Sequence, residues 1–355
     1  MKLTDIASMR LVNQQITRAK FAHPKDVMSY MCAIQAQDYD MSKWAIGARM
    51  SKSTIGMVND ALDNGDIIRT HVLRPTWHLV SREDIYWILQ LTAPQVRAAM
   101  KSNDKRLEIT EELFSKSNRL IEKALTGNKH LTREELMAHF KQAGIITNEN
   151  RASHFLMRAE TEGIICSGKR SGSHQTYTLL PELIIKPAEL TKDECLAKLA
   201  QTYFASRSPA TLKDFIWWSG LSTTAARHAL EMVKNNFIAE TINKQEYWLS
   251  NDFTIPVTLK ASVNLLPAFD EYLIAYADRS AVIHPSHQPH AFTNNGIFKP
   301  VIIINGQAKG IWKRTVKNNT VSIETNFFGK PAKLLQPKIS KAAKEYAHFL
   351  GKTLV

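Results

Sequence analysis

One pattern recurs three times in the first two-thirds of this chain, and it limits the possible folds more than any other feature. Each copy reads as two amphipathic helices joined by a turn, followed by a short β-hairpin. In the middle copy, Thr132 and Glu135 form a capping box that opens the first helix. The second helix, 151–162, stops at Gly163, and the runs 164–166 and 176–179 flank a Gly/Ser/Lys/Arg tip.

The other two copies follow the same plan. In the third copy Thr211 and Asp214 open a helix, 222–233 forms the next helix, and the runs 237–239 and 247–249 form the hairpin. The first copy predicts three helices and a hairpin, at 25–35, 41–50, 54–63 and 67–80. Helix-turn-helix followed by a two-stranded wing is the winged-helix unit, so three tandem units are expected. Such units bind DNA or other proteins.

After residue 251 the pattern changes to short β runs separated by turn signals. Asn305-Gly306 between two of these runs is a strong type I′ hairpin signal. The predicted fold is therefore α+β: three tandem winged-helix units followed by a small C-terminal antiparallel β-barrel with a terminal helix at 340–350. The expected domains are 1–100 (winged helix 1), 101–190 (winged helix 2), 191–250 (winged helix 3) and 251–355 (barrel and helix).

Positive charge points to a polyanionic partner. The chain has 46 Lys and Arg against 33 Asp and Glu, a formal net charge of +13. From Lys299 to the end, eleven Lys and Arg face only two Glu. The expected phosphate contacts are Lys169 and Arg170 at the middle hairpin tip and Lys313 and Arg314 in the predicted barrel. Binding to a polyanion is favourable because each cation near a phosphate releases counterions. General solubility is the alternative interpretation of the charge.

The cysteines and the N-terminus indicate a cytoplasmic protein. The three Cys residues lie far apart with no CxxC pair, so we expect no structural zinc site. Asp5 and Arg10 interrupt the apolar region that a signal peptide needs. The longest apolar stretches are far shorter than the ~20 residues that span a bilayer, so no membrane association is expected.

Three stretches together resemble a known family. They are AIQAQ (33–37) with WAIGAR (44–49), RTHVLRPTWHLV (69–80), and LPAFDEY (266–272) with DRS (278–280). In combination they resemble the AlkZ/YcaQ-like winged-helix DNA glycosylases, over roughly residues 5–330. The resemblance implies tandem winged helices, a C-terminal β-barrel, and hydrolysis of the N-glycosidic bond of alkylated purines, including bulky or crosslinked adducts, in double-stranded DNA.

The resemblance also implies the catalytic residues. The family signature is Gln, an apolar residue, then Gln or Asp, and here it reads Gln35-Ala36-Gln37. Asp38 falls one position too late to be the Asp of the other branch. Two amides suffice for a purine that already carries a positive charge, because a Gln can orient a hydrolytic water without accepting a full proton. The alternative interpretation is that both Gln residues belong to the C-terminal cap of the helix 25–35.

The first hairpin and Trp44 supply further candidates for the substrate pocket. Arg69, Thr70, Trp77 and His78 lie on the first hairpin, where His78 could donate to a flipped base and Trp77 or Trp44 could stack on it. A structural histidine is the alternative for His78.

Two further clusters, one of charged residues and one of histidines, have the residue types of an ion-pair network and of a metal site. Asp270, Glu271 and Arg279 are expected to form a buried ion-pair network. The trio His284, His287 and His290 has the spacing of a ligand set, but it lies in a loop without an acidic ligand, so no metal is expected.

The sequence thus predicts a monomeric, monofunctional DNA glycosylase that needs no cofactor. No Lys is identified as a Schiff-base nucleophile, so an abasic product is expected without strand cleavage. The alternative is a non-catalytic winged-helix DNA-binding protein, a transcription regulator or a lesion binder. A regulator usually dimerises on a palindrome, and the sequence shows no obvious dimerisation helix.

Overall fold

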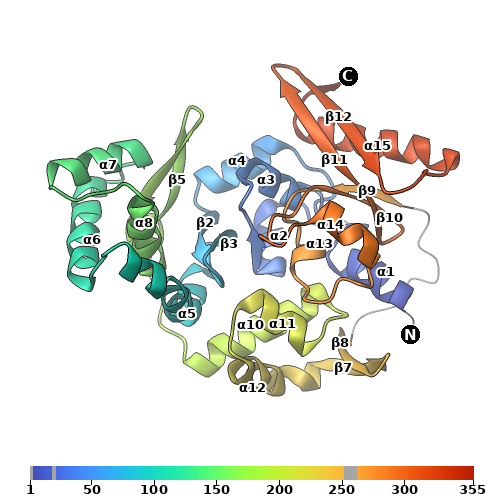
Figure 1. Ribbon diagram of the computed structural model, residues 1–355, viewed down its shortest axis with the longest axis horizontal. Coiled ribbons are helices and arrows are strands. Elements are labelled where there is room, and N and C mark those ends of the chain that lie inside the picture. Colours follow the sequence, from blue (N-terminus) through green and yellow to red (C-terminus); the bar gives the residue numbers. More distant parts are fainter. Residues whose placement is uncertain (1–2, 18–20, 252–261) are drawn as a thin grey trace. The chain divides into compact units, whose positions relative to one another are not determined.

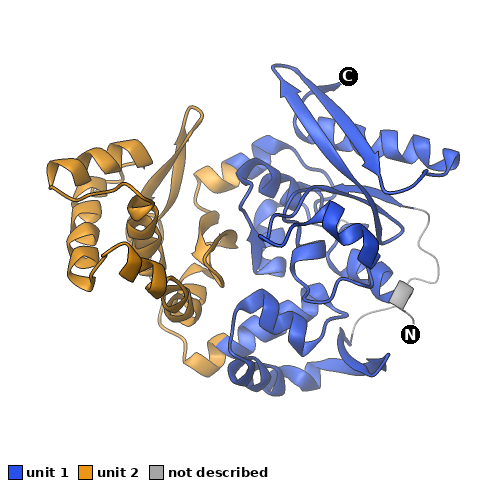
Figure 2. Ribbon diagram, viewed as in Figure 1, with its two compact units in different colours: residues 1–59, 196–355 blue, residues 60–195 orange. Residues whose placement is uncertain are grey.

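The computed structural model describes residues 3–17, 21–251 and 262–355, and the chain forms two compact units (Figures 1 and 2). Unit 1 comprises residues 1–59 and 196–355, and unit 2 comprises residues 60–195. The divisions fall inside two helices, α4 (Ile55–Asp63) and α10 (Lys192–Arg207). The four domains expected from the sequence stay a prediction, because the two units group the chain more coarsely.

Both units mix helices and strands, as an α+β sequence predicts. Unit 2 contains β2 (Ile67–Val72), β3 (Thr76–Ser81), α5 (Ile85–Arg106), α6 (Glu111–Leu125), β4 (Leu131–Thr132), α7 (Arg133–Gln142), α8 (Arg151–Thr161), β5 (Ile165–Ser171), β6 (His174–Leu179) and α9 (Leu180–Leu183). The first part of unit 1 contains α1 (Leu3–Asn13), α2 (Pro24–Met31), β1 (Ala33–Gln35) and α3 (Tyr39–Gly47). The elements after α10 are α11 (Leu212–Ser219), α12 (Thr223–Val233), η1 (Lys234–Asn236), β7 (Phe237–Ile242), β8 (Gln245–Ser250), β9 (Val263–Leu266), α13 (Glu271–Ile274), η2 (Pro285–His287), α14 (Gln288–Ala291), β10 (Val301–Ile304), β11 (Gln307–Lys317), β12 (Thr320–Phe327), η3 (Lys333–Leu335), α15 (Gln336–Phe349) and β13 (Thr353–Leu354).

The middle copy of the repeated pattern has the expected elements in unit 2. The capping box forms at the start of α7, where the Thr132 side chain accepts from Glu135 N–H and Glu135 accepts from Thr132 N–H. Helix α8 ends before Gly163, whose φ of 70° only glycine adopts without strain. Strands β5 and β6 then pair antiparallel as a hairpin, and Phe140 and Phe155 fill the core between the helices.

The third copy lies in unit 1 and also has the expected elements. Thr211 and Asp214 form a capping box at α11, and Ser222 caps α12 by accepting from Ala225 N–H. Strands β7 and β8 pair antiparallel along their length. The first hairpin, β2 with β3, is likewise antiparallel and has the predicted bounds to within one residue.

The C-terminal region is a five-stranded sheet in the order β13-β12-β11-β10-β9. Asn305 and Gly306 join β10 to β11 with φ values of 50° and 82°, the two positive values that a type I′ turn requires. Among the described residues β13 and β9 are edge strands, so closure into a barrel stays a prediction. Trp312 from β11 donates to Leu266 O at 2.8 Å and packs on Tyr346 of α15.

Three predicted helix bounds are wrong. The helix expected at 25–35 ends at Met31, because Cys32 has a φ of 61° and the chain continues as strand β1. The helix expected at 41–50 is Tyr39–Gly47, because Asp38 caps it by accepting from Met41 N–H. The terminal helix expected at 340–350 is Gln336–Phe349, with Pro337 in its first turn, where a missing N–H costs nothing.

Among the described residues, no helix combines the length and the apolar character needed to cross a lipid bilayer.

Candidate active site

Gln35 lies on a strand and Gln37 in the bend that follows it, and helix α2 already ends at Met31, which corrects the interpretation that the two Gln residues cap that helix. Gln35 is the last residue of β1 and is 4% exposed, whereas Gln37 is exposed just before α3. Asp38 follows and is occupied as the N-cap of α3, with its Oδ1 at 3.0 Å from Met41 N. The exposed Gln37 amide is therefore the accessible polar group of the motif, and the neighbouring carboxylate has a structural role.

The motif follows directly on a strained turn. Cys32 has φ 61° and ψ −57°, a combination close to a γ-turn that side chains other than glycine rarely adopt. Such a residue costs about 1–3 kcal/mol and persists only where the surroundings hold it. Arg207, the last residue of α10, donates from Nη1 to Met31 O at 2.9 Å and from Nη2 to Ala33 O at 2.7 Å. One guanidinium thus binds the carbonyls on both sides of Cys32.

Glu271 completes this arrangement from the start of α13. Its Oε2 accepts from Arg207 Nε and Nη2 at 3.0 and 2.7 Å and from Trp218 Nε1 at 2.9 Å. Its Oε1 accepts from the backbone N–H of Gln35 at 3.1 Å. Arg207 and Glu271 are both fully buried, at 0% exposure. Removing one partner of such a pair leaves a buried charge uncompensated, which typically costs about 3–5 kcal/mol.

Two more buried ion pairs lie in unit 1. Arg49 binds Asp270 through its two terminal guanidinium nitrogens, at 2.9 and 3.0 Å, and Arg10 lies 3.6 Å from Asp214. The structure therefore confirms the buried ion pairs expected for Asp270 and Glu271. Arg279, expected in the same network, donates to Leu273 O and lies over the rings of Phe292 and Phe298, among other contacts.

Tyrosines around these pairs are desolvated. Burial is the main reason that the pKa values of Tyr203 and Tyr272 lie well above their usual range and that the pKa of Tyr276 is raised to about 12. All three therefore stay neutral at physiological pH and act as hydrogen-bond donors: Tyr203 to Ala275 O, Tyr272 to Ala7 O, and Tyr276 to Arg207 O. The interior of unit 1 thus holds its charged groups in a fixed hydrogen-bonded network.

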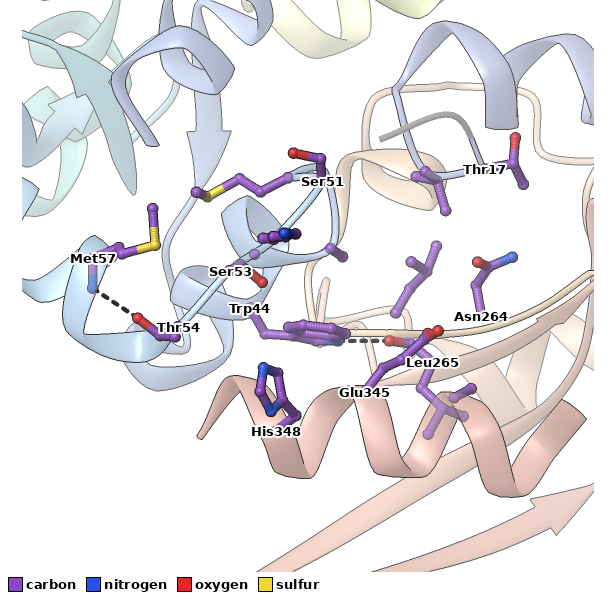
Figure 3. Close-up of a pocket in the computed structure, with 17 residues that line it drawn as sticks. Thr17, Trp44, Ser51, Ser53, Thr54, Met57, Asn264, Leu265, Glu345 and His348 are labelled. Carbon is purple, nitrogen blue, oxygen red and sulfur yellow. Dashed lines mark hydrogen bonds between the residues drawn. The ribbon is translucent and has the colours of Figure 1, made fainter. Parts of the chain in front are cut away.

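Trp44 lines a cavity of about 850 Å³ (Figure 3), and Gln37 is not among the residues that line it. Its indole Nε1 donates to Leu265 O at 2.7 Å, and its ring packs against Tyr346 and Phe349 of α15. The cavity also contacts Ser51, Thr54 and His348 and lies beyond the C-terminal end of α3. Gln37 precedes the N-terminus of that helix, and nine residues span ~12 Å. A stacking role for Trp44 stays a hypothesis.

The remaining pocket candidates lie on the β2–β3 hairpin of unit 2. Arg69 donates to Gln175 Oε1 at 2.7 Å, and its guanidinium lies 3.9 Å above the centre of the half-buried Trp77 ring. Thr70 and His78 are 1% and 0% exposed and face each other in the strand register. His78 Nδ1 lies 2.9 Å from Thr76 O. These contacts favour structural roles for Arg69 and His78 in the state described.

The predicted phosphate contacts differ in accessibility. Lys169 and Arg170 are exposed at the end of β5, beside the turn of the middle hairpin. Lys313 is exposed on β11, whereas Arg314 is half-buried and donates to the Tyr346 hydroxyl. The first three side chains are therefore accessible to a phosphate backbone, and Arg314 is held by Tyr346.

The histidine trio does not converge. His284 Nδ1 lies 2.8 Å from Ser286 Oγ, while His287 and His290 pack on the ring of Phe328. In the described part of the chain, no group of three or more His, Cys, Asp or Glu side chains has the arrangement of a metal site.

Sequence reasoning did not identify Arg207, although it contacts the motif segment directly. The available signal was a charged residue in the otherwise apolar and small-residue run 203–209, just after the aromatic pair Tyr203-Phe204. A charge at such a position is buried only with a partner. The partner, Glu271, lies 64 residues away, so the pairing itself depends on the tertiary fold.

Comparisons with known proteins agree with one another. The family model described as DNA glycosylase AlkZ-like matches residues 28–349. The interstrand DNA cross-link repair glycosylase of Streptomyces sahachiroi is 22% identical over 337 residues, covering 86% of this chain and 88% of that protein. The solved structure of the Streptomyces sahachiroi DNA glycosylase AlkZ superimposes with a TM-score of 0.83 over 100% of both chains, at 18% identity. This last match establishes a shared fold.

Proposed function

The chain belongs to the AlkZ-like DNA glycosylase family, and from that premise we propose that it hydrolyses the N-glycosidic bond of cationic alkylated purines, with water oriented by Gln35 and Gln37. The observation that carries this proposal is the Gln-x-Gln segment itself. It emerges from a buried, hydrogen-bonded turn and presents the Gln37 amide to solvent. The side-chain amide of a glutamine can accept a hydrogen bond from a water and donate another.

The chemistry suits a leaving group that needs no acid. An N3- or N7-alkylated purine already carries a positive charge and departs as a neutral base. The transition state resembles an oxocarbenium ion, so a water molecule suffices as the nucleophile. Water adds to C1′, its proton passes to solvent, and an abasic site remains. A neutral amide also avoids strong pairing with the cationic base in the ground state, which would bind substrate without accelerating the step.

The substrate is proposed to be double-stranded DNA, bound by the helix-turn-helix-hairpin segments acting as winged helices. Lys169, Arg170 and Lys313 are exposed and suited to bind phosphates, with no sequence readout required. The Streptomyces relative is named for interstrand cross-link repair. We extend the proposed substrate range to bulky and crosslinked N7 adducts on that ground, with the protein acting as a monomer and without a cofactor.

Excision of N7-methylguanine from a duplex oligonucleotide tests this function. Wild-type protein should release the base and leave an alkali-labile abasic site. The double variant Gln35→Ala/Gln37→Ala should lose base release while its DNA affinity stays within about threefold, because two neutral amides add little to phosphate binding. Wild-type-like excision by the double variant would contradict the assignment. DNA binding without excision by the wild type would favour the non-catalytic alternative.

A further inference from the structure

The peptide backbone before and within the Gln-x-Gln segment is held by a buried ion pair from distant parts of the chain. The turn at Cys32 has a positive φ of 61° and resembles a γ-turn, and β1, which follows it, has only three residues. Local sequence offers little to hold this turn, since Cys32 is not a glycine. Arg207 donates to the carbonyls of Met31 and Ala33, one on each side of Cys32. One side chain thus binds the backbone both where α2 ends and where β1 begins.

Glu271 links that side chain to the motif. One carboxylate oxygen accepts from Arg207 and the other from Gln35 N–H. Trp218 Nε1 donates to the same oxygen as Arg207, so the carboxylate has little freedom to rotate. Arg207 also donates from Nη1 to Ser206 Oγ, which gives every guanidinium nitrogen at least one partner. The result is a chain of hydrogen bonds that ends on the backbone N–H of Gln35, two residues before Gln37.

We propose that Arg207 and Glu271 are positioning residues that fix Gln35 and Gln37 for water orientation. This proposal rests on the function proposed above. A glutamine that only orients water acts through the distance and angle at which it holds that water, because it contributes no proton transfer. A misplacement of about 1 Å can lower a rate by about a hundredfold. Neither Arg207 nor Glu271 touches substrate in this proposal, since both are fully buried.

The neighbouring pair Arg49–Asp270 supplies a matched control. Asp270 adjoins Glu271 in sequence and is 3% exposed, and it also binds an arginine. The polar contacts of this pair are with Ala45 O, Gln14 and Tyr272 N–H, outside the segment 31–37. Asp270→Asn therefore removes one buried negative charge at the same depth without touching the motif backbone.

The activity test compares Glu271→Gln with Asp270→Asn at a temperature at which both are fully folded. The single-turnover rate for N7-methylguanine and the Kd for the same duplex are measured separately. Glu271→Gln should lower the rate by about tenfold or more with Kd within about threefold, and Asp270→Asn should stay within about threefold in both. Equal loss of rate in the two variants, or a wild-type rate in Glu271→Gln, overturns the proposal.

Hydrogen exchange tests the anchor without relying on activity. In the wild type without DNA, the backbone N–H of Gln35 should exchange as slowly as backbone amides in the core helices. Glu271→Gln should accelerate this exchange, whereas Asp270→Asn should leave it slow. Exchange at the rate of an exposed loop in the wild type refutes the anchor even if excision is normal. Conversely, a protected Gln35 amide in a protein that excises nothing refutes the proposed function but not the anchor. If Glu271→Gln does not fold, Glu271→Asp replaces it in both measurements, because it keeps the charge beside Arg207 and withdraws from Gln35.

Discussion

Gln37 is the exposed amide of the motif, so its replacement tests the selectivity of the reaction most directly. If water is only oriented, the leaving group must supply the driving force, and neutral lesions should be poor substrates. Gln37→Asp should retain excision of N7-methylguanine, because a carboxylate can hold the same water and stabilise the oxocarbenium ion. It should also tighten ground-state binding of the cationic base, which offsets part of the added stabilisation of the transition state.

The measurement compares N7-methylguanine with hypoxanthine, a neutral lesion, for wild type and Gln37→Asp side by side. The wild type should remove hypoxanthine at least about a hundredfold more slowly. Efficient removal of hypoxanthine by the wild type would refute water orientation as the mechanism, since two amides cannot expel an unactivated base.

Individual residues were predictable from the sequence where a short motif carries the information. The resemblance singled out Gln35 and Gln37, whose catalytic role stays a prediction. The buried ion pairs of Asp270 and Glu271 were predicted from the charged residues of one motif and are confirmed. The bond from Gln35 N–H to Glu271 was not predictable, because its partners lie 236 residues apart. The exclusion of Asp38 as a base stays a prediction, and its capping of α3 became visible only in the structure.

Among the secondary-structure elements, the β5–β6 hairpin depends on close packing at Gly168. A Cβ at that position would lie 2.4 Å from His130 Nδ1 and 2.8 Å from Thr176 Oγ1. Gly168→Ala should therefore displace His130, break its hydrogen bond from Lys169 N–H, and destabilise the protein by about 1–3 kcal/mol. Urea unfolding measures this loss. Gly329→Ala is the control, because nothing lies within 4 Å of its Cβ position and its φ is not positive.

The same hairpin should respond to pH through His130. Burial, and then the charge of Lys169, hold the pKa of His130 below its usual range, so the folded hairpin favours the neutral ring. The unfolded state binds a proton first as pH falls below about 6.5, and stability is lost from there down through the lowered folded pKa. Exchange of the Lys169 amide should therefore accelerate at acidic pH after correction for intrinsic rates. His130→Gln, which accepts the same bond without titrating, should remove this dependence.

Elements were predictable where their ends are local. Capping boxes at Thr132 and Thr211 and the glycine at 163 marked helix ends correctly, because side chain and backbone partner are three residues apart or fewer. Helix α2 was predicted four residues too long because its apolar spacing continues to Ile34. At its real end, Met31 O accepts from Arg207, a distant partner that no local pattern reveals.

At the scale of the whole molecule, the salt dependence of DNA binding reports how many phosphates are contacted. Replacing Lys169, Arg170 and Lys313 together with Ala should reduce the slope of log K against log salt by about 3 units, because each phosphate contact contributes about 0.9. Arg314→Ala should add less, since its guanidinium already donates to Tyr346. Fluorescence anisotropy at several salt concentrations gives the slopes, and an unchanged slope would mean that the bound DNA lies elsewhere.

The two units also differ in how soon each can form during synthesis. Unit 2 is one continuous segment, 60–195, and should fold as an isolated fragment with the unfolding cooperativity of a small domain. Circular dichroism with urea titration of that fragment tests this, and a non-cooperative transition would contradict it.

Unit 1 joins residues 1–59 to residues that follow 195, so its first segment must wait for the rest. At roughly 5–20 residues per second, the interval between synthesis of Gln35 and of Glu271 is on the order of 10–50 s. During that time the nascent chain carries the Gln-x-Gln sequence without the side chains that shape its turn. A premature stop codon between Gln37 and Glu271 would therefore leave the motif in the sequence but remove the carboxylate that binds the Gln35 N–H.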